Sequence, residues 1–324
     1  MDLVAHFRRE TRAFEDAVRR AARAGDAPPV PSCPGWTVTD LTGHLGWVQR
    51  FVARIVRDRL HDAPERVDTT FLDLPADRAG WPDPAHPPTH GPVPASLVDW
   101  FADGAAALAS LFAERDPADP VWTWSADRTT GFWLWAQTFE AAVHRWDAES
   151  ALGAPGPFDA ELAAGGVGWF LGTVVPAWRA GGRAVPGAGE RFAFRRTDGE
   201  GHWTVHFDGD TVRYAPGPGP GDVELSGSAS DLTLFLWRRV PAERLAGVEG
   251  TGVSWSGGPR WCRRSDGRGG SSSEGHPMWT KTAGPSNTGN LLAGEGIAVH
   301  RRLRGALRRA ARHRRTRPPR RARP

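Results

Sequence analysis

The chain has 324 residues, enough for two domains, and its hydrophobic (40%) and charged (24%) fractions are those of an ordinary globular protein. Its formal net charge of +4 is unevenly distributed, because residues 251–324 hold 17 of the 41 basic residues and 3 of the 37 acidic ones. Residues 1–250 therefore carry 24 basic and 34 acidic residues, a net charge of −10. This balance excludes a strongly basic nucleic-acid-binding face on residues 1–250.

Other features of the composition predict a cytoplasmic protein. No apolar run approaches the roughly 18 residues of a membrane span, because Arg, Asp or Gly interrupts each candidate. The N-terminal 25 residues are amphipathic and lack the apolar core of a signal peptide. Cys33 and Cys262 are too few for a disulfide framework, which fits a reducing compartment.

Helical periodicity dominates the first half of the chain. Apolar residues recur at spacings of three and four in four segments, residues 2–24, 37–60, 96–116 and 130–152. We expect Thr37 or Thr39 to cap the second helix, Ser96 to cap the third, and Gly153 to follow the end of the fourth. Four helices joined by one long crossover favour an all-α four-helix bundle over residues 1–155.

The long crossover, residues 61–94, is rich in Pro, Asp and His. It predicts an irregular connection with at most a short helix near residues 69–73. Connections of this length often form lids or pocket walls.

After a Pro-Gly-Pro boundary at residues 155–157, the pattern indicates a smaller α+β domain over residues 158–250. A helix is expected first, and Ser230 or Asp231 is expected to open a second one. Three segments in which apolar and polar side chains alternate predict an antiparallel meander, followed by a short strand and a closing strand. The predicted helices are residues 159–180 and 231–240, and the predicted strands are 191–198, 202–210, 210–217, 222–228 and 241–250.

Residues 251–324 lack periodicity and are dense in Gly, Ser and Arg, which predicts a disordered basic tail. One interpretation is an arm that binds nucleic acid or an anionic membrane. The other, which we favour, is a segment foreign to the fold, such as a frame change in a GC-rich gene would produce.

A candidate metal site lies on the fourth predicted helix. Glu140 and His144 are four residues apart and therefore share one helix face. With His44 from the second helix, they would give a divalent cation two imidazoles, one carboxylate and an open position, as in catalytic zinc sites. The alternative is a surface glutamate and two ordinary histidines. Asp147, on nearly the same face, is expected either to orient a ligand histidine or to pair with an arginine.

Several neighbours of these residues have more ordinary explanations. Arg145 and Glu149 are expected to form ion pairs that maintain the fold, and Cys33, before a Pro-Gly turn, is expected to be structural. Three tryptophans, Trp36, Trp47 and Trp146, are expected either to wall a pocket or to pack in the core.

Two segments, PSCPGWTVTDLTGHL at 31–45 and TFEAAVHRWDAE at 138–149, resemble the mycothiol-dependent maleylpyruvate isomerase family of actinobacteria. The resemblance covers about residues 1–250. It implies a DinB-like four-helix bundle with His44, Glu140 and His144 as zinc ligands, followed by the family's C-terminal domain. It further implies that Arg239 binds the substrate carboxylate, although Arg238 stands where the family usually has glycine.

The function implied by this resemblance is a zinc-dependent isomerase or S-transferase that uses mycothiol as its thiol and acts on a small carboxylate or electrophile. The thiol would add to a double bond, permit rotation, and then be eliminated. The alternative is a non-catalytic protein that keeps the fold, with or without metal, for binding or regulation.

Overall fold

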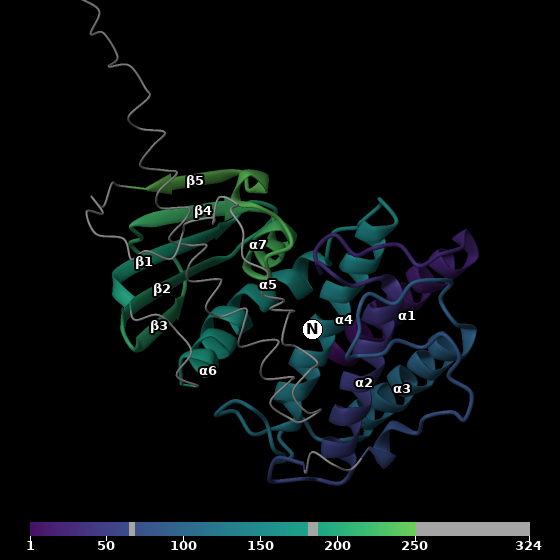
Figure 1. Cartoon of the computed structure of the whole chain (residues 1–324). Helices are drawn as coiled ribbons and strands as arrows, with labels where there is room; N and C mark the ends of the chain where they lie inside the picture. Colours follow the sequence, from purple (N-terminus) through teal and green to yellow (C-terminus); the bar gives the residue numbers. More distant parts are fainter. Residues whose placement is uncertain (65–68, 181–186, 251–324) are drawn as a thin grey trace, which may run out of the picture.

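The protein is described by a computed structural model that covers residues 1–64, 69–180 and 187–250. Within this part of the chain, a helical N-terminal region is followed by a smaller region with a five-stranded sheet (Figure 1). The expectations for the tail (disorder, a basic arm, or a segment foreign to the fold) concern residues 251–324, which lie outside this description. The predicted order of a helical region and then an α+β region is confirmed.

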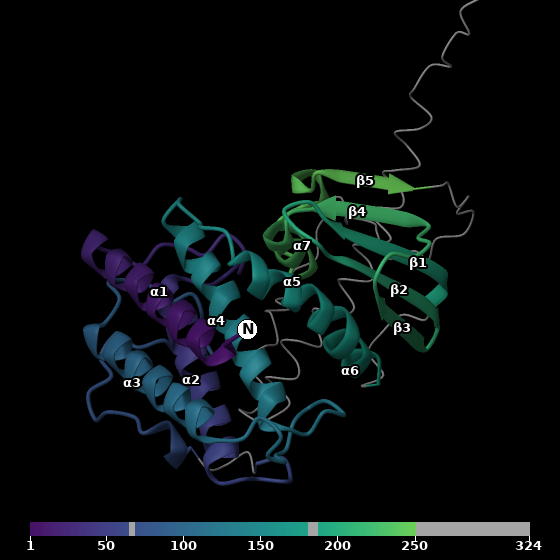
Figure 2. The same cartoon turned by 180° about the vertical axis from the view of Figure 1, so that it is seen from behind.

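The helical region consists of α1 (Leu3–Ala24), α2 (Val38–Arg57), α3 (Ala95–Glu114) and α4 (Thr130–Ala151). α1 contacts α4 and α3, and α2 contacts α3 and α4 (Figure 2). All four helices contribute apolar side chains to the core, and Phe7, Phe51, Phe112 and Phe132, one from each helix, share one core cluster. The four predicted helices are confirmed, and a 3₁₀ turn, η1 (Thr70–Leu72), lies where a short helix was expected.

The helix caps were predicted less well than the helices. Thr37 caps α2 in a capping box with Asp40, as one of the two predicted choices. The prediction for α3 was wrong, because the helix begins at Ala95 after Pro94, and the Ser96 hydroxyl accepts a hydrogen bond from Trp81 instead. In the second region, Ser228 caps the helix predicted to open at Ser230 or Asp231.

The sheet has the strand order β3-β2-β1-β4-β5. The predicted antiparallel meander of three strands is confirmed, whereas β4 is parallel to β1 and closes the sheet from the other side with β5. The segment predicted as the closing strand, residues 241–250, begins with a 3₁₀ turn, η3 (Ala242–Arg244), and only its end forms a strand. The strands are β1 (Gly187–Arg196), β2 (His202–Gly209), β3 (Thr211–Pro216), β4 (Val223–Gly227) and β5 (Gly247–Gly250).

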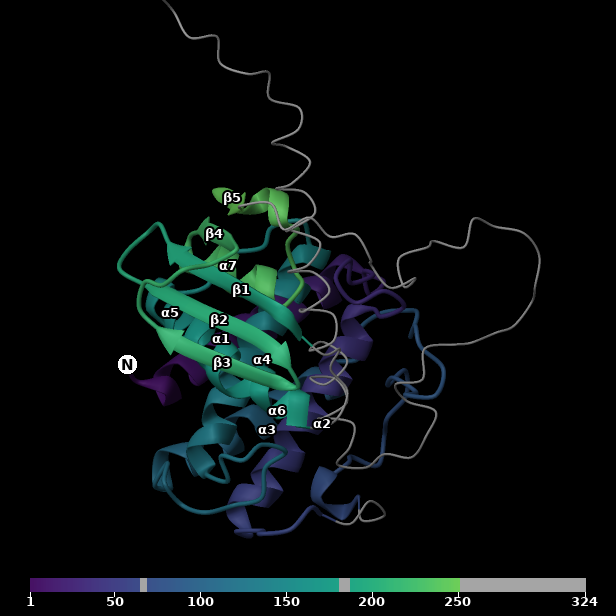
Figure 3. The ribbon, with the colours of Figure 1, turned by 90° about the vertical axis from the view of Figure 1, so that its left-hand side faces the viewer.

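Helices cover the sheet face that is turned toward the helical region (Figures 1 and 3). They are α5 (Ala160–Trp169), the π-helical turn η2 (Phe170–Val174), α6 (Val175–Ala180) and α7 (Ala229–Leu236). The predicted single helix at 159–180 is thus interrupted by a π turn. Phe192, Phe194 and Phe207 are buried against these helices and belong to the same core cluster as Phe170 and Leu171.

α4 joins the two regions. Phe139 on α4 stacks against Trp135 at 5.9 Å, Trp169 at 5.8 Å and Trp237 at 6.5 Å between ring centroids. Close approach requires Gly166 on α5, since a Cβ atom there would lie 2.1 Å from the Phe139 ring. Phe139 belongs to the same core cluster as the sheet. The second region is therefore held against the helix that carries the candidate ligands.

Two helical stretches, Ala95–Glu114 and Ala160–Ala180, are long and apolar enough to cross a membrane by length and composition alone. About half of each stretch, 50% and 44% of its most apolar window, is buried inside the fold. Core helices pass the same test, so these stretches are weak evidence for a span.

Candidate metal centre

Helices α2 and α4 bring the three predicted ligands together. His44 Nε2 lies 3.2 Å from Glu140 Oε1, and His144 Nε2 lies 3.5 Å from the same oxygen. The donor atoms of the three side chains all lie within 4.8 Å of one another. All three residues are buried, with exposed fractions between 2% and 8%. We call His44, Glu140 and His144 the donor cluster.

The donor cluster holds one carboxylate in its ionised form. Burial by itself raises the pKa of Glu140, but hydrogen bonds to His144 and His44 outweigh burial and leave that pKa well below its usual range. Burial lowers the pKa of His44, and the hydrogen bond to Glu140 opposes that effect without reversing it. His44 is accordingly a neutral imidazole near pH 7, which is the form that binds metals.

His144 is held from its other side by Asp147. Its Nδ1 lies 2.9 Å from Asp147 Oδ2, so Nε2 is the nitrogen that faces Glu140. Burial by itself lowers the pKa of His144, but the hydrogen bonds to Asp147 and Glu140 outweigh burial and raise it to about 9. Such carboxylate–histidine pairs fix the ring orientation of metal ligands.

Asp147 pairs in turn with Arg239 from the second region, so it contacts both His144 and an arginine. Arg239 donates from Nε to Asp147 Oδ1 at 3.0 Å and from Nη2 to Oδ2 at 2.7 Å. Burial raises the pKa of Asp147, but attraction to Arg239 and the hydrogen bond to His144 outweigh burial and lower it. The chain from Arg239 to Asp147 to His144 thus couples the second region to the donor cluster.

The backbone at the end of α7 places Arg239. The Arg239 N–H donates to Leu234 O at 2.7 Å and the Arg238 N–H to Phe235 O at 3.0 Å, which is the pattern of a Schellman motif. Arg238 occupies the left-handed position of this motif with φ of 65°. Glycine is the usual residue there because it has no Cβ atom to clash. Arg238 is therefore a site of local backbone strain immediately before Arg239.

Two residues at this centre were missed by sequence reasoning. Ser32 donates to Asp147 Oδ1 at 2.5 Å, and Cys33 Sγ lies 3.7 Å from Asp147 Oδ2 and 3.9 Å from Arg239 Nη2. No basic group lies near Cys33 in the sequence, but the fold brings the Arg239 guanidinium next to its thiol. More than 110 residues separate these partners, so only the CPGW motif itself marked the segment.

The donor cluster fits a divalent cation such as zinc. Two imidazole nitrogens and one carboxylate oxygen form a common catalytic zinc donor set, and they leave further coordination positions for a ligand. A second grouping, Cys33 with His144 and Asp147, also has its atoms within 4.8 Å. It fits a cation less well, because Arg239 and Ser32 already engage both Asp147 oxygens.

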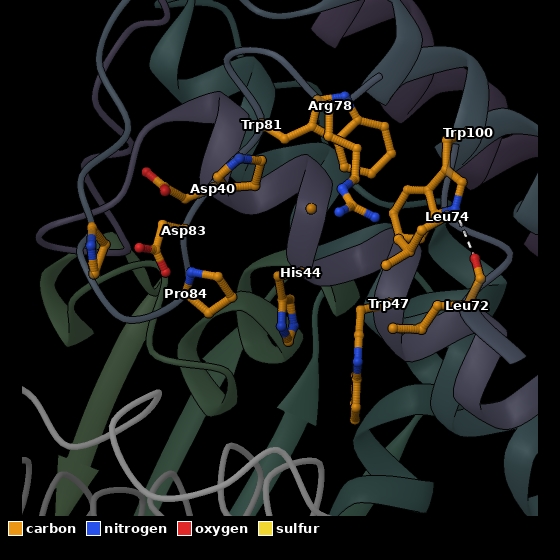
Figure 4. A pocket seen from close by; sticks show the side chains of 13 residues that line it. Asp40, His44, Trp47, Leu72, Leu74, Arg78, Trp81, Asp83, Pro84 and Trp100 are labelled. Atoms are coloured by element: carbon orange, nitrogen blue, oxygen red, sulfur yellow. Dashed lines mark hydrogen bonds between the residues drawn. The ribbon is translucent and has the colours of Figure 1, made fainter. Parts of the chain in front are cut away.

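A pocket of about 420 Å³ opens beside the donor cluster, with His44 on its wall (Figure 4). Its other walls come from α2, from Trp100 on α3, and from residues 72–87 of the long connection. The connection therefore forms a pocket wall, as its length and composition suggested. Of the three tryptophans considered, Trp47 lines this pocket; Trp36 packs against the His44 ring at 5.2 Å, and Trp146 packs against the core of the second region.

Ion pairs elsewhere on α4 maintain the fold. Arg145 Nε donates to Glu10 at 2.9 Å, Nη1 donates to Glu149 at 2.8 Å, and both Nη atoms reach the backbone carbonyls of residues 156 and 157. The predicted structural role of Arg145 and Glu149 is confirmed.

Comparison with known protein families matches both regions. Residues 2–149 match the mycothiol maleylpyruvate isomerase N-terminal domain, and residues 161–256 match the MDMPI C-terminal domain. Comparison with curated proteins and with solved structures gave no match. The first matched segment contains the whole donor cluster and Asp147, and the second contains Arg239, which pairs with Asp147. Since the two domains occur in order and together span most of the described fold, the chain belongs to the mycothiol maleylpyruvate isomerase family.

Proposed function

We propose that the protein is a zinc-dependent isomerase or S-transferase that uses mycothiol as its thiol and acts on a small carboxylate or electrophile. The observation that carries the proposal is the convergence of His44, Glu140 and His144 on one buried point beside an open pocket. Family membership supports thiol-dependent isomerase chemistry, and the donor set supports the metal.

His44, Glu140 and His144 would hold the cation. When bound, a divalent cation supplies Lewis acidity that lowers the pKa of a nearby thiol, so that the thiolate forms near neutral pH. The addition of that thiolate to one carbon of a double bond leaves a single bond that rotates, and elimination of the same thiol restores the double bond. No atoms are gained or lost by an isomerisation of this kind.

The protein's own residues prepare this chemistry. Asp147 orients the His144 ring, and Arg239 keeps Asp147 ionised and fixed in place. Binding of a substrate carboxylate by Arg239 stays a prediction. All three guanidinium nitrogens of Arg239 already donate hydrogen bonds, two to Asp147 and one to Trp237 O. In the described fold, Arg239 is a positioning residue.

The finer description of the fold belongs to the same proposal. We infer that α1–α4 form a DinB-like four-helix bundle over residues 1–155, and that residues 158–250 form a separate α+β domain of a cytoplasmic protein. The pairing of α1 and α2 with both α3 and α4 supports the bundle. The core cluster that Phe139 shares with the sheet supports a contact between the two domains along α4.

The direct test combines metal analysis with turnover. Full-length protein purified without added metal is expected to carry about one zinc per chain and to isomerise maleylpyruvate, or to conjugate another small electrophile, only when mycothiol is present. Glu140→Ala is expected to lose both zinc and turnover. Turnover by metal-free protein, or the same zinc content in Glu140→Ala, contradicts the proposal.

A further inference from the structure

Most of the residues that line the pocket beside the donor cluster have no charged or hydroxyl group. Nine of its thirteen lining residues are Trp, Leu, Pro or Gly. Leu74, at 41% exposure one of two exposed large hydrophobic residues in the described part of the chain, also lines it. A ligand rich in hydroxyl groups finds few partners on such walls, whereas a flat apolar ligand buries itself and Leu74 together. We call this space the aromatic pocket.

Three tryptophans of the aromatic pocket are fixed in place. Trp100 Nε1 donates to Leu72 O at 2.9 Å, and the Arg50 guanidinium lies 4.2 Å from the centre of the Trp100 ring. Trp81 Nε1 donates to Ser96 Oγ at 2.9 Å, and the Trp81 and Trp100 rings lie 5.1 Å apart. Aromatic walls that are already ordered cost little entropy when a flat ligand stacks on them.

Trp47, the third of these tryptophans, stacks on Phe51 at 5.4 Å with ring planes 7° apart. Two glycines of α2 let the other walls approach the helix. A Cβ atom at Gly43 would lie 2.5 Å from Pro82, and one at Gly46 would lie 2.4 Å from Trp100. Glycine at these two positions of α2 therefore allows the connection and α3 to contact this helix closely.

One cation enters this apolar space. Figure 4 shows the Arg78 side chain reaching from the connection into the pocket. Its guanidinium makes no ion pair with another described residue, and it is the only permanently positive group among the described lining residues. Both carboxylates of the lining are engaged elsewhere: Asp40 accepts from Thr37 and Thr89, and Asp83 accepts from the Ala85 N–H and pairs with His86.

We propose that the aromatic pocket binds a planar, apolar monocarboxylate with a conjugated double bond, with Arg78 on the carboxylate and the tryptophans against the flat face. Guanidinium suits carboxylate because it donates two parallel hydrogen bonds. His44, which belongs to the donor cluster, lines the same pocket, so the unsaturated part of such a ligand would face the cluster at which a thiol would act. This inference rests on the proposed function for its meaning as a substrate class, but binding to the pocket requires no turnover.

The test is a calorimetric titration of the full chain with three probes: trans-cinnamate, its neutral analogue trans-cinnamamide, and the polar dicarboxylate fumarate. Saturable binding of cinnamate is expected, at least about tenfold tighter than that of cinnamamide or fumarate. Arg78→Gln is expected to weaken cinnamate binding by about tenfold or more and to leave cinnamamide unchanged. Arg213→Gln, on exposed β3 and away from the pocket, is the matched control and should bind like the wild type.

The proposal is overturned if cinnamate does not bind saturably, if cinnamamide binds as tightly, or if Arg78→Gln behaves like Arg213→Gln. Because Arg78 is exposed, equal thermal melting of both variants checks that folding is intact. Failure of the proposed function would look different: cinnamate binding would retain its dependence on Arg78 while no electrophile is turned over. Conversely, zinc-dependent turnover of maleylpyruvate without cinnamate binding would remove this inference alone.

Discussion

The donor cluster and the aromatic pocket lie side by side and share His44, yet they differ in backbone structure and in the polarity of their side chains. The donor cluster stands on two long regular helices, and its polar atoms are joined through Asp147 to Arg239 in a buried network. The aromatic pocket is walled largely by an irregular connection with apolar side chains. Chemistry that must keep its geometry is placed on rigid helices, whereas recognition, which varies more easily, is placed on a loop.

The largest expected difference between the two concerns metal binding. His144→Ala is expected to lower zinc affinity more than about 100-fold, because it removes a ligand outright rather than a residue behind one. Zinc titration with a competing chelator measures this. His86→Ala, which removes an exposed histidine paired with Asp83 in the connection, is the control and should bind zinc normally. Equal affinity in both variants would place the metal elsewhere.

The buried pair behind the donor cluster should dominate stability. Arg239→Met leaves Asp147, which is fully buried, without its guanidinium partner and is expected to lower the free energy of unfolding by about 3 kcal/mol. Urea unfolding measures the loss. Arg78→Gln, the corresponding change in the aromatic pocket, should lose less than about 0.5 kcal/mol because Arg78 is exposed. A similar loss in both variants would show that Arg239 does not anchor the centre.

A pH dependence should be confined to the donor cluster. The pKa of His144 is raised in the folded chain from 6.5 to about 9, so its protonated form stabilises the metal-free fold fully below pH 6.5, and that stabilisation disappears as pH rises through about 9. Metal-free protein is expected to lose on the order of 1–3 kcal/mol of unfolding free energy across this window. His144→Gln should show no such loss, and a loss of the same size in that variant would assign it to another group.

The smallest effect is expected at Arg238, which occupies the left-handed position at the end of α7. Arg238→Gly relieves a left-handed residue with φ of 65° and is expected to raise the free energy of unfolding by about 0.5–1 kcal/mol. Arg238→Ala keeps the Cβ atom and should gain little. If both variants gain equally, charge rather than backbone conformation is responsible.

Sequence reasoning predicted the donor cluster better than the aromatic pocket for a physical reason. Glu140 and His144 are linked by helical periodicity, and His44 lies on a helix face marked by its apolar neighbours, so local rules bring them into consideration. The contacts of Arg78, Ser32 and Cys33 depend on how loops close over α2 and α4, and no local pattern encodes that. The parallel pairing of β4 with β1 was missed for the same reason, since it depends on a crossover between distant segments.

X-ray absorption spectroscopy on stoichiometrically zinc-loaded full-length protein would show directly whether His44, Glu140 and His144 bind zinc, as we claim. The expected spectrum shows two imidazole ligands in the wild type and one fewer in His44→Ala. A spectrum with no imidazole ligands, or one left unchanged by His44→Ala, would contradict the claim.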